Sequence, residues 1–144
     1  MRLNVGIIGA GYAAREIHIP AYKILKDIVS VKAICDVNMS RAKKVAKMFK
    51  IPIYYKDPVK LVENADIDVI DICTPPVSHY KLSILAINSG KHVLVEKPIA
   101  LSSEEAKQMV NSALHNSVKL CEVKNFRYMP NIVRLKQTID EGLI

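Results

Sequence analysis

The chain has 144 residues, of which 50% are hydrophobic and 24% are charged, and its formal net charge is +7. This composition suits one folded domain and excludes a disordered chain, and no stretch approaches the ~18 consecutive apolar residues that a membrane-spanning helix needs. The basic balance favours anionic partners, such as nucleic acid or a phosphorylated cofactor.

Apolar, strand-like runs alternate with amphipathic helical segments along the whole chain. In chain order the pattern predicts strand 3–9, a helix from about residue 12, strand 30–36, helix 40–50, strand 51–55, helix 58–64, strand 67–74, helix 78–89, strand 92–97, helix 102–117, strand 118–125 and helix 130–141. The strands are rich in valine and isoleucine with little polar alternation, which is typical of strands buried on both faces. Short connections between strands and helices imply right-handed crossovers. The predicted fold class is therefore α/β, a Rossmann-type doubly wound parallel sheet forming a single domain over residues 1–144.

Local signals mark several element boundaries. Pro20 is expected to break or bend the first helix, because proline lacks a backbone N–H. Ser40 is a candidate N-cap of the second helix. Ser102 with Glu105 has the pattern of a capping box, and Gly90 suits the left-handed end of the helix before it.

The lysines and cysteines bear on partners and location. The lysine-rich segment 43–50 has helical spacing, so we expect a solvated helix face, and without a nucleic-acid motif we expect no nucleic-acid partner. The spacing of Cys35, Cys73 and Cys121 fits no common metal site. Their apolar settings predict reduced, buried thiols in a cytoplasmic protein.

A glycine motif lies at the end of the first strand. Residues 9–14 read G-x-G-x-x-A. Gly9 permits a tight turn, Gly11 lets a pyrophosphate approach the backbone, and Ala14 is small enough for the helix to lie against the strand. The free N–H groups of the helix N-terminus then face the anion. The alternative is a structural turn that binds no ligand.

Asp36 ends the second strand, about 20 residues beyond the motif. A carboxylate there accepts hydrogen bonds from the ribose hydroxyls of an adenosine and repels a 2′-phosphate, which favours NAD over NADP. Arg41 lies close enough in sequence to weaken that preference.

Two further strand ends carry candidate residues, since ligands bind at the carboxyl edge of such sheets. Glu96 and Lys97 follow the fifth strand, and Thr74 with Pro75 follows the fourth. His79 lies in the first turn of the next helix. Without further context each has a structural alternative: a solvated charged pair, strand-ending prolines and a helix-capping histidine.

Together these segments resemble the N-terminal domain of the glucose–fructose oxidoreductase, inositol dehydrogenase and rhizopine-catabolism family, written Gfo/Idh/MocA. The matching stretches are GIIGAGYAAREIHIPA, the acid of CDVN, IDVIDICTPPVSHY, GKHVLVEKPIALSSEEA and VKNFRYMPNIVRLKQTIDEGLI. They follow one another in order over nearly the whole chain, and the combination is specific although its pieces are not. The family consists of NAD- or NADP-dependent oxidoreductases that act mostly on sugars, cyclitols and related polyols.

The resemblance implies roles for individual residues. The residues implied to bind the cofactor are Gly9, Gly11, Tyr12, Ala13, Asp36, Arg41, Thr74, Pro75, His79, Glu96 and Asn125. Lys97 of the family's E-K-P motif is implied to be catalytic and to bind or deprotonate the substrate hydroxyl, with Arg127 lining the substrate site. This role has a physical basis, because the positive charge of an oxidised nicotinamide disfavours a protonated amine beside it.

The chain departs from the family in one respect. Relatives continue into a substrate domain with an Asp-x-x-x-His helix, and no aspartate here is followed by histidine four residues on. We therefore expect a chain that lacks the C-terminal substrate domain, binds nucleotide without efficient turnover, and leaves apolar surface able to drive self-association into a homo-oligomer. The alternatives are a non-catalytic dinucleotide-binding sensor or accessory subunit, and a methyltransferase that binds S-adenosylmethionine.

Overall fold

One parallel sheet of six strands organises residues 2–144, the part of the chain that the computed structural model describes. The strands are β1 (Leu3–Ile8), β2 (Val29–Cys35), β3 (Ile53–Tyr55), β4 (Val69–Ile72), β5 (His92–Val95) and β6 (Leu120–Glu122). Their order in the sheet is β3-β2-β1-β4-β5-β6, with every neighbouring pair parallel. The chain thus winds outward to β3 and then crosses to β4, which makes the carboxyl ends of β1 and β4 the topological switch point.

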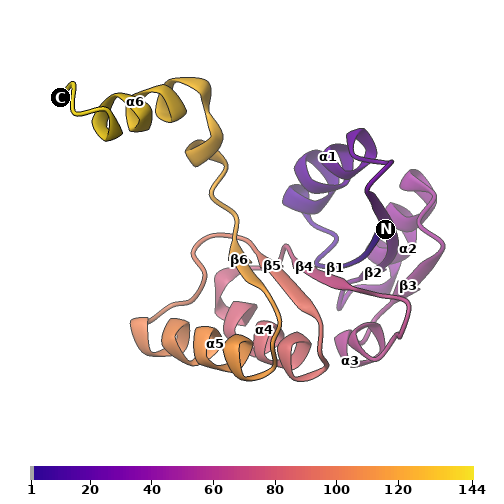
Figure 1. Ribbon diagram of the computed structural model, residues 1–144. Coiled ribbons are helices and arrows are strands. Elements are labelled where there is room, and N and C mark those ends of the chain that lie inside the picture. The colour runs from indigo at the N-terminus through magenta and orange to yellow at the C-terminus, as the bar shows by residue number, and fades with distance from the viewer. Residues whose placement is uncertain (1) are drawn as a thin grey trace.

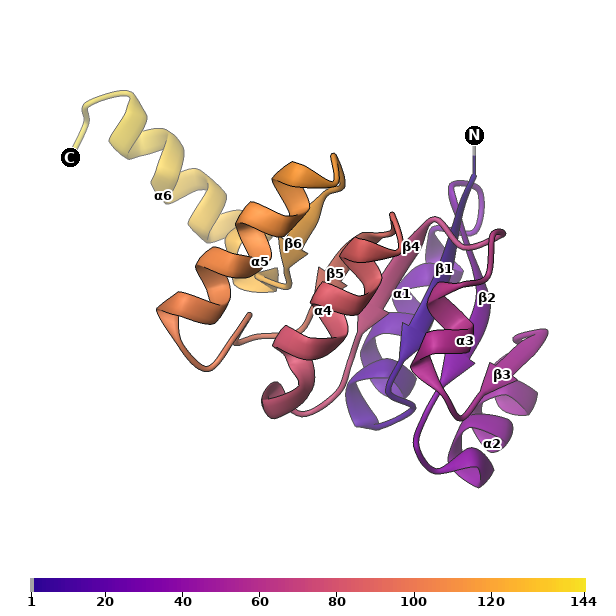
Figure 2. The same ribbon diagram turned by 90° about the horizontal axis from the view of Figure 1, so that it is seen from below.

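Helices cover both faces of this sheet, which confirms the predicted doubly wound Rossmann-type fold. The helices are α1 (Ile19–Ile24), α2 (Met39–Phe49), α3 (Pro58–Val62), α4 (His79–Asn88), α5 (Ser103–His115) and α6 (Pro130–Asp140), with shorter turns η1 (Ala14–His18), η2 (Pro76–Ser78) and η3 (Asn125–Tyr128). Helices α1 and α2 lie on one face, and α3, α4 and α5 lie on the other (Figure 1 and Figure 2).

The two faces bury separate cores, because successive side chains of a strand point to opposite faces. On β4, Ile70 and Ile72 join the core beneath α3, α4 and α5. Cys73, directly after β4, belongs to the core beneath α1 and α2. The alternation places Asp71 on the α1 side of the sheet, fully buried.

The expected break at Pro20 and the expected N-cap at Ser40 are both wrong. Pro20 does not break the first helix, which runs from residue 12 to 24 and widens into a π-helical turn at Ala14–His18. In that turn the Ile19 N–H donates to the Ala14 carbonyl, five residues earlier, which is the hydrogen bond of a π-helix. The wider turn directly precedes Pro20, which has no N–H to donate. The N-cap of α2 is Asn38 instead of Ser40, since the Asn38 side chain accepts from the Arg41 N–H.

Other local signals are confirmed. Ser102 caps α5 by accepting from the Glu105 N–H, which is one half of the expected capping box. The Glu105 carboxylate accepts from the N–H of Leu101, one residue before the N-cap, in place of the Ser102 N–H. Gly90 has a φ of +72° and ends α4 in the left-handed region. Several strands are shorter than predicted, and the edge strand β6 keeps only three paired residues.

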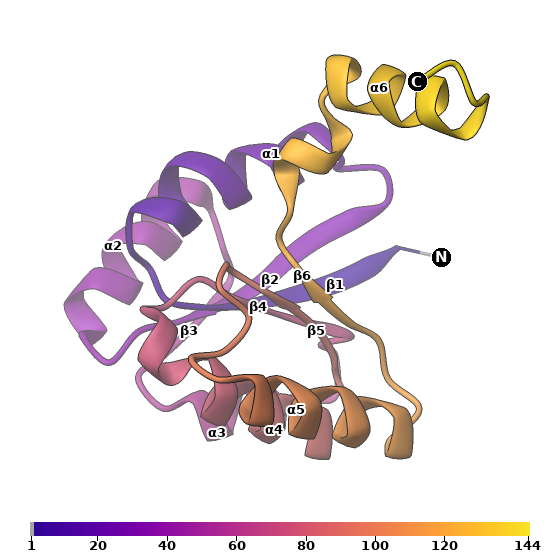
Figure 3. The same ribbon diagram turned by 90° about the vertical axis from the view of Figure 1, so that its left-hand side faces the viewer.

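Helix α6 stands apart from the sheet, beyond the end of β6 (Figure 1 and Figure 3). Its apolar side chains are 40–50% exposed at Ile132, Val133, Leu135 and Ile139. Among residues 2–144, no helix combines the length and the apolar character needed to cross a bilayer.

Cys121 is exposed, which corrects the expectation that all three thiols are buried. It lies on the edge strand β6, whereas Cys35 and Cys73 lie at the ends of inner strands. Burial raises the pKa of Cys35 to about 12, with the charge of Asp36 adding to the effect, and burial also raises that of Cys73.

These settings predict how the three thiols react with a thiol-specific reagent. With Ellman's reagent at pH 8, we expect one fast-reacting thiol in the native protein and three in guanidinium chloride. Cys121→Ser should remove the fast phase. Fast native labelling that persists in Cys121→Ser would contradict the assignment.

Candidate functional site

A cavity of about 680 Å³ opens at the switch point of the sheet. It lies at the carboxyl ends of β1, β2 and β4, with the turn before η1 and the loop before α4 as further walls. The predicted site residues that line it are Gly9, Gly11, Tyr12, Asp36, Arg41, Thr74 and Pro75. Ligands bind in this crevice of doubly wound folds, so the cavity is the candidate site.

The two glycines of the turn have different surroundings. Gly9 has a φ of +100°, and a Cβ built on it would lie 2.7 Å from the Cys73 carbonyl oxygen. Its N–H donates to the Cys35 carbonyl at 2.8 Å, so Gly9 is wedged between the ends of β2 and β4. A Cβ on Gly11 would meet nothing within 4 Å, so the backbone there faces open space. The turn thus combines a fixed base at Gly9 with an accessible backbone at Gly11.

Asp36 fastens this turn to the end of β2. One carboxylate oxygen accepts from the Ala10 N–H at 2.9 Å, and the other accepts from the Asn38 N–H at 2.8 Å. The Arg41 guanidinium is 3.4 Å from the first oxygen and is half exposed. A carboxylate offers about four lone pairs, so Asp36 keeps capacity for a ligand hydroxyl while it holds the turn.

Apolar side chains form part of the cavity wall that the motifs did not reveal. They are Val37, Pro58, Val77 and Leu82. Val37 is 81% exposed and Val77 is 72% exposed, although both are apolar. Each directly follows a stretch that the sequence marks, Val37 after Asp36 and Val77 after the two prolines, and this proximity is the one signal that could have found them.

His79 is fully buried and does not line the cavity. Its Nδ1 lies 2.7 Å from the Pro98 carbonyl oxygen, and its Nε2 lies 2.8 Å from the Thr74 carbonyl oxygen. The ring therefore ties the loop after β4 to the loop after β5 from behind the wall of the cavity.

The remaining predicted residues are spread around the same edge of the sheet. Ala13 lies in the first helical turn after the glycines. Lys97 is exposed after β5 and is outside the residues lining the cavity. Asn125 borders a second groove of about 320 Å³, together with Leu94. Arg127 is exposed and lines neither space.

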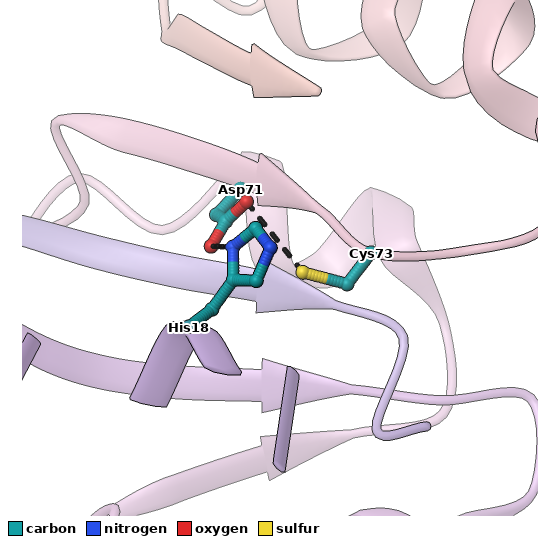
Figure 4. A group of neighbouring side chains, drawn as sticks. All are labelled: His18, Asp71 and Cys73. Carbon is teal, nitrogen blue, oxygen red and sulfur yellow. Dashed lines mark hydrogen bonds and ion pairs between the residues drawn. The ribbon is translucent and has the colours of Figure 1, made fainter. Parts of the chain in front are cut away.

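A buried polar network lies beside the switch point on the α1 face. Figure 4 shows His18 on its helical turn facing Asp71 of β4, with Cys73 next to both. The His18 Nδ1 is 2.8 Å from Asp71 Oδ2, and its Nε2 is 2.9 Å from Glu96 Oε1. The Tyr22 hydroxyl donates to the same Asp71 oxygen at 2.9 Å.

The network is charged. Burial alone lowers the pKa of His18, but the hydrogen bonds and charges of Asp71 and Glu96 outweigh it and raise that pKa to about 9. Burial acts to raise the pKa of Glu96, but the hydrogen bonds from His18 and the Lys97 backbone and the nearby positive charges leave it lowered. Burial raises the pKa of Tyr22, and the Asp71 charge raises it further. At neutral pH an imidazolium therefore lies between two carboxylates.

His18, Asp71 and Cys73 also bring one potential metal-binding atom each within 4.8 Å of one another. Hydrogen bonds join Asp71 to both the histidine and the thiol, and a protonated His18 repels a cation. The cluster therefore acts as an ion-paired network. No motif in the sequence indicates this network. The available signal is Asp71 itself, an acid inside an otherwise apolar strand, because a buried carboxylate needs a partner.

Comparisons with known proteins agree with this geometry. A family model described as "Oxidoreductase family, NAD-binding Rossmann fold" matches residues 3–124. A D-glucoside 3-dehydrogenase of Escherichia coli (strain K12) is 30% identical over 142 residues, which cover 99% of this chain and 40% of the relative. The chain thus spans about 40% of that relative's length.

Solved structures give the same result. A levoglucosan dehydrogenase in complex with NADH has a TM-score of 0.92 at 30% identity, over 99% of this chain and 40% of that chain. A mutant 3-ketoreductase from Actinomadura kijaniata, in complex with TDP-benzene and NADP, has a TM-score of 0.90 at 28% identity, over 100% of this chain and 44% of that one.

Proposed function

The chain belongs to the Gfo/Idh/MocA oxidoreductase family, whose matching part is an NAD-binding Rossmann fold, and on that premise we propose that its cavity binds a nicotinamide dinucleotide, with NAD preferred to NADP. The observation that carries the proposal is the open backbone at Gly11 above a turn that Gly9 and Asp36 hold in place. A pyrophosphate needs such a surface, where no side chain blocks the N–H groups of a helix start.

The lining of the cavity also suits the parts of the dinucleotide other than its pyrophosphate. The helix starts at Tyr12, directly after Gly11, and the first N–H groups of a helix have no partner within it, so they are available to an anion. The Asp36 carboxylate offers the ribose hydroxyls an acceptor, and the apolar wall that includes Val37 and Pro58 offers a flat ring a contact surface. His79 contributes indirectly, by holding the loops that carry Thr74 and Pro98.

The preference for NAD rests on charge. A 2′-phosphate would approach the buried Asp36 carboxylate, whose repulsion Arg41 offsets only in part, since its nearest nitrogen is 3.4 Å away and its side chain is half exposed. Similar proteins bind one cofactor or the other: the levoglucosan dehydrogenase structure is a complex with NADH, and the 3-ketoreductase structure is a complex with NADP.

The chain spans about 40% of a relative's length, so we propose an oxidoreductase reaction for a whole protein that contains such a domain. The bound nicotinamide supplies hydride transfer, and the substrate is a sugar, cyclitol or related polyol. Lys97, at the carboxyl edge of the sheet, binds the reacting hydroxyl and takes or relays its proton. Asn125 and Arg127 follow β6. Asn125 stays a prediction for cofactor binding, and Arg127 stays a prediction for the substrate side of the site. This chain on its own is proposed to bind nucleotide without efficient turnover.

Titration of the chain with NADH, NADPH and S-adenosylmethionine tests the proposal, with Gly11→Val as the informative variant. We expect wild-type protein to bind NADH and Gly11→Val to lose at least tenfold in affinity, about 1.4 kcal/mol, because the added side chain occupies the pyrophosphate position. The melting temperature should change little, since a Cβ at Gly11 meets no atom within 4 Å. Binding of S-adenosylmethionine without NADH, or full NADH affinity in a folded Gly11→Val, would refute the proposal.

A further inference from the structure

The Glu96 carboxylate joins the buried network to the residue proposed to act on substrate. One of its oxygens is 2.9 Å from His18 Nε2. The other accepts from the Lys97 backbone N–H at 3.0 Å. The carboxylate therefore links the histidine ring to the turn that carries Lys97.

The other side of the ring is anchored in the centre of the sheet. His18 Nδ1 bonds Asp71, which is fully buried on β4 and is also held by the Tyr22 hydroxyl. His18 itself is only 7% exposed and lies in the π-helical turn. A continuous chain of hydrogen bonds thus runs from the core to the backbone of Lys97. Glu96 directly follows β5 and is half-buried, whereas Lys97 and Pro98 after it are exposed.

We propose that His18 is a positioning residue: its ring holds the Glu96 carboxylate against the Lys97 amide and so fixes the turn that presents the Lys97 side chain to the site. The consequence for catalysis rests on the proposed function, in which Lys97 binds the substrate hydroxyl. The structural part of the inference does not, because His18 lies outside the residues that line the dinucleotide cavity.

Protonation of the ring is what lets it hold both carboxylates. A doubly protonated ring donates from both nitrogens, whereas a neutral imidazole donates from one. With the pKa of His18 raised to about 9, the ring holds both partners at neutral pH and releases one as pH rises through that value.

Other groups near the ring leave this titration to His18. The charged and titratable side chains around it are Asp71 and Cys73 of the β4 segment, Tyr22 of α1, Glu96 and Lys97 after β5, Cys121, Glu122, Lys124 and Tyr128 of β6 and the segment after it, and Arg15 and Glu16 of its own helix. Because Cys121 is exposed, the titration is followed in a Cys121→Ser background. Arg15 pairs with Glu16, and Lys124 pairs with Glu122. The raised pKa values of Tyr22 and Cys73 keep both neutral in this pH range.

Carbon-detected NMR of the whole chain tests the inference by following the Glu96 carboxyl and Lys97 carbonyl carbons from pH 6 to 10. In wild type both signals should titrate with a midpoint near pH 9, the value to which the pKa of His18 is raised. In His18→Gln that titration should vanish, and the Lys97 amide should exchange with solvent at least tenfold faster at pH 7. His92→Gln is the matched control, because His92 lies at the start of β5, at the opposite edge of the sheet, and should leave both signals unchanged.

The outcomes separate the inference from the proposed function. An unchanged titration in His18→Gln, or a wild-type ring that titrates near 6.5, would overturn the inference whether or not NADH binds. If NADH fails to bind while the Lys97 signals behave as expected, the proposed function falls and the positioning role of His18 stands. Should His18→Gln fail to fold, Glu96→Gln provides the second test, in which the pKa of His18 must fall by at least one unit because a charged partner is lost.

Stability should follow the same group. The pKa of His18 is 6.5 in an unfolded chain and about 9 in the native protein. Its contribution to the free energy of unfolding is therefore fully present below 6.5 and is lost as pH rises through 9. Urea denaturation of wild type should show this decline between pH 7 and 9, whereas His18→Gln should show a flatter profile. Parallel profiles in the two proteins would contradict the charged state of the ring.

Discussion

Gly9→Ala is expected to destabilise the protein by about 3 kcal/mol or more, because two costs act at the same position. A φ of +100° is strained for any residue with a Cβ, and the new Cβ would lie 2.7 Å from a backbone oxygen, that of Cys73. Backbone at the end of β4 cannot move away cheaply, since the Cys73 N–H is itself bonded to the Ile8 carbonyl at 2.8 Å. Chemical denaturation of the purified variant measures the loss.

Gly11→Ala is the matched control for this prediction. It adds the same methyl group two residues further on, where nothing lies within 4 Å. Its free energy of unfolding should stay within about 0.5 kcal/mol of wild type, as for ordinary surface substitutions. Equal losses in the two variants would show that Gly9 is not wedged against the end of β4.

Asp36→Asn should change cofactor choice more than any other single substitution in the cavity. The loss of the negative charge removes a charge-assisted hydrogen bond to the ribose, worth about 1.5–3 kcal/mol, so NADH affinity should fall by roughly 10- to 100-fold. Affinity for NADPH should rise relative to that for NADH. In the wild-type protein a guanidinium nitrogen of Arg41 is 3.4 Å from an Asp36 carboxylate oxygen, and without that charge Arg41 is free to pair with a 2′-phosphate. Fluorescence titration with both reduced cofactors gives the ratio.

Asparagine keeps an oxygen that can accept from the Ala10 N–H, so this variant spares the glycine turn better than alanine does. The double variant Asp36→Asn with Arg41→Ala is the control, and it should lose the gain in NADPH binding. If Asp36→Asn kept the wild-type ratio of the two affinities, Asp36 would serve only to hold the turn, and the proposed preference for NAD would be wrong.

The sequence by itself determined the fold class and the position of the cavity. Apolar runs without polar alternation indicate strands buried on both faces, and their alternation with helices leaves a doubly wound parallel sheet as the consistent arrangement. Gly9, Gly11 and Asp36 could be found because each occupies a strand end or the turn after it. In a parallel sheet all such ends meet at one edge, so local position in the chain predicts which of these residues share the cavity.

Only the tertiary structure decided which polar groups pair with one another. His18 bonds to Asp71, which lies 53 positions further along the chain, and to Glu96, which lies 78 positions further along. These bonds depend on the rotation of the first helix over β4 and on the pleat that turns Asp71 toward it, and no local pattern encodes either of them. The same reason explains why His79 lies behind the cavity wall and why Cys121 is exposed: burial of a side chain follows from which elements cover it, and coverage is a property of the assembled sheet and helices.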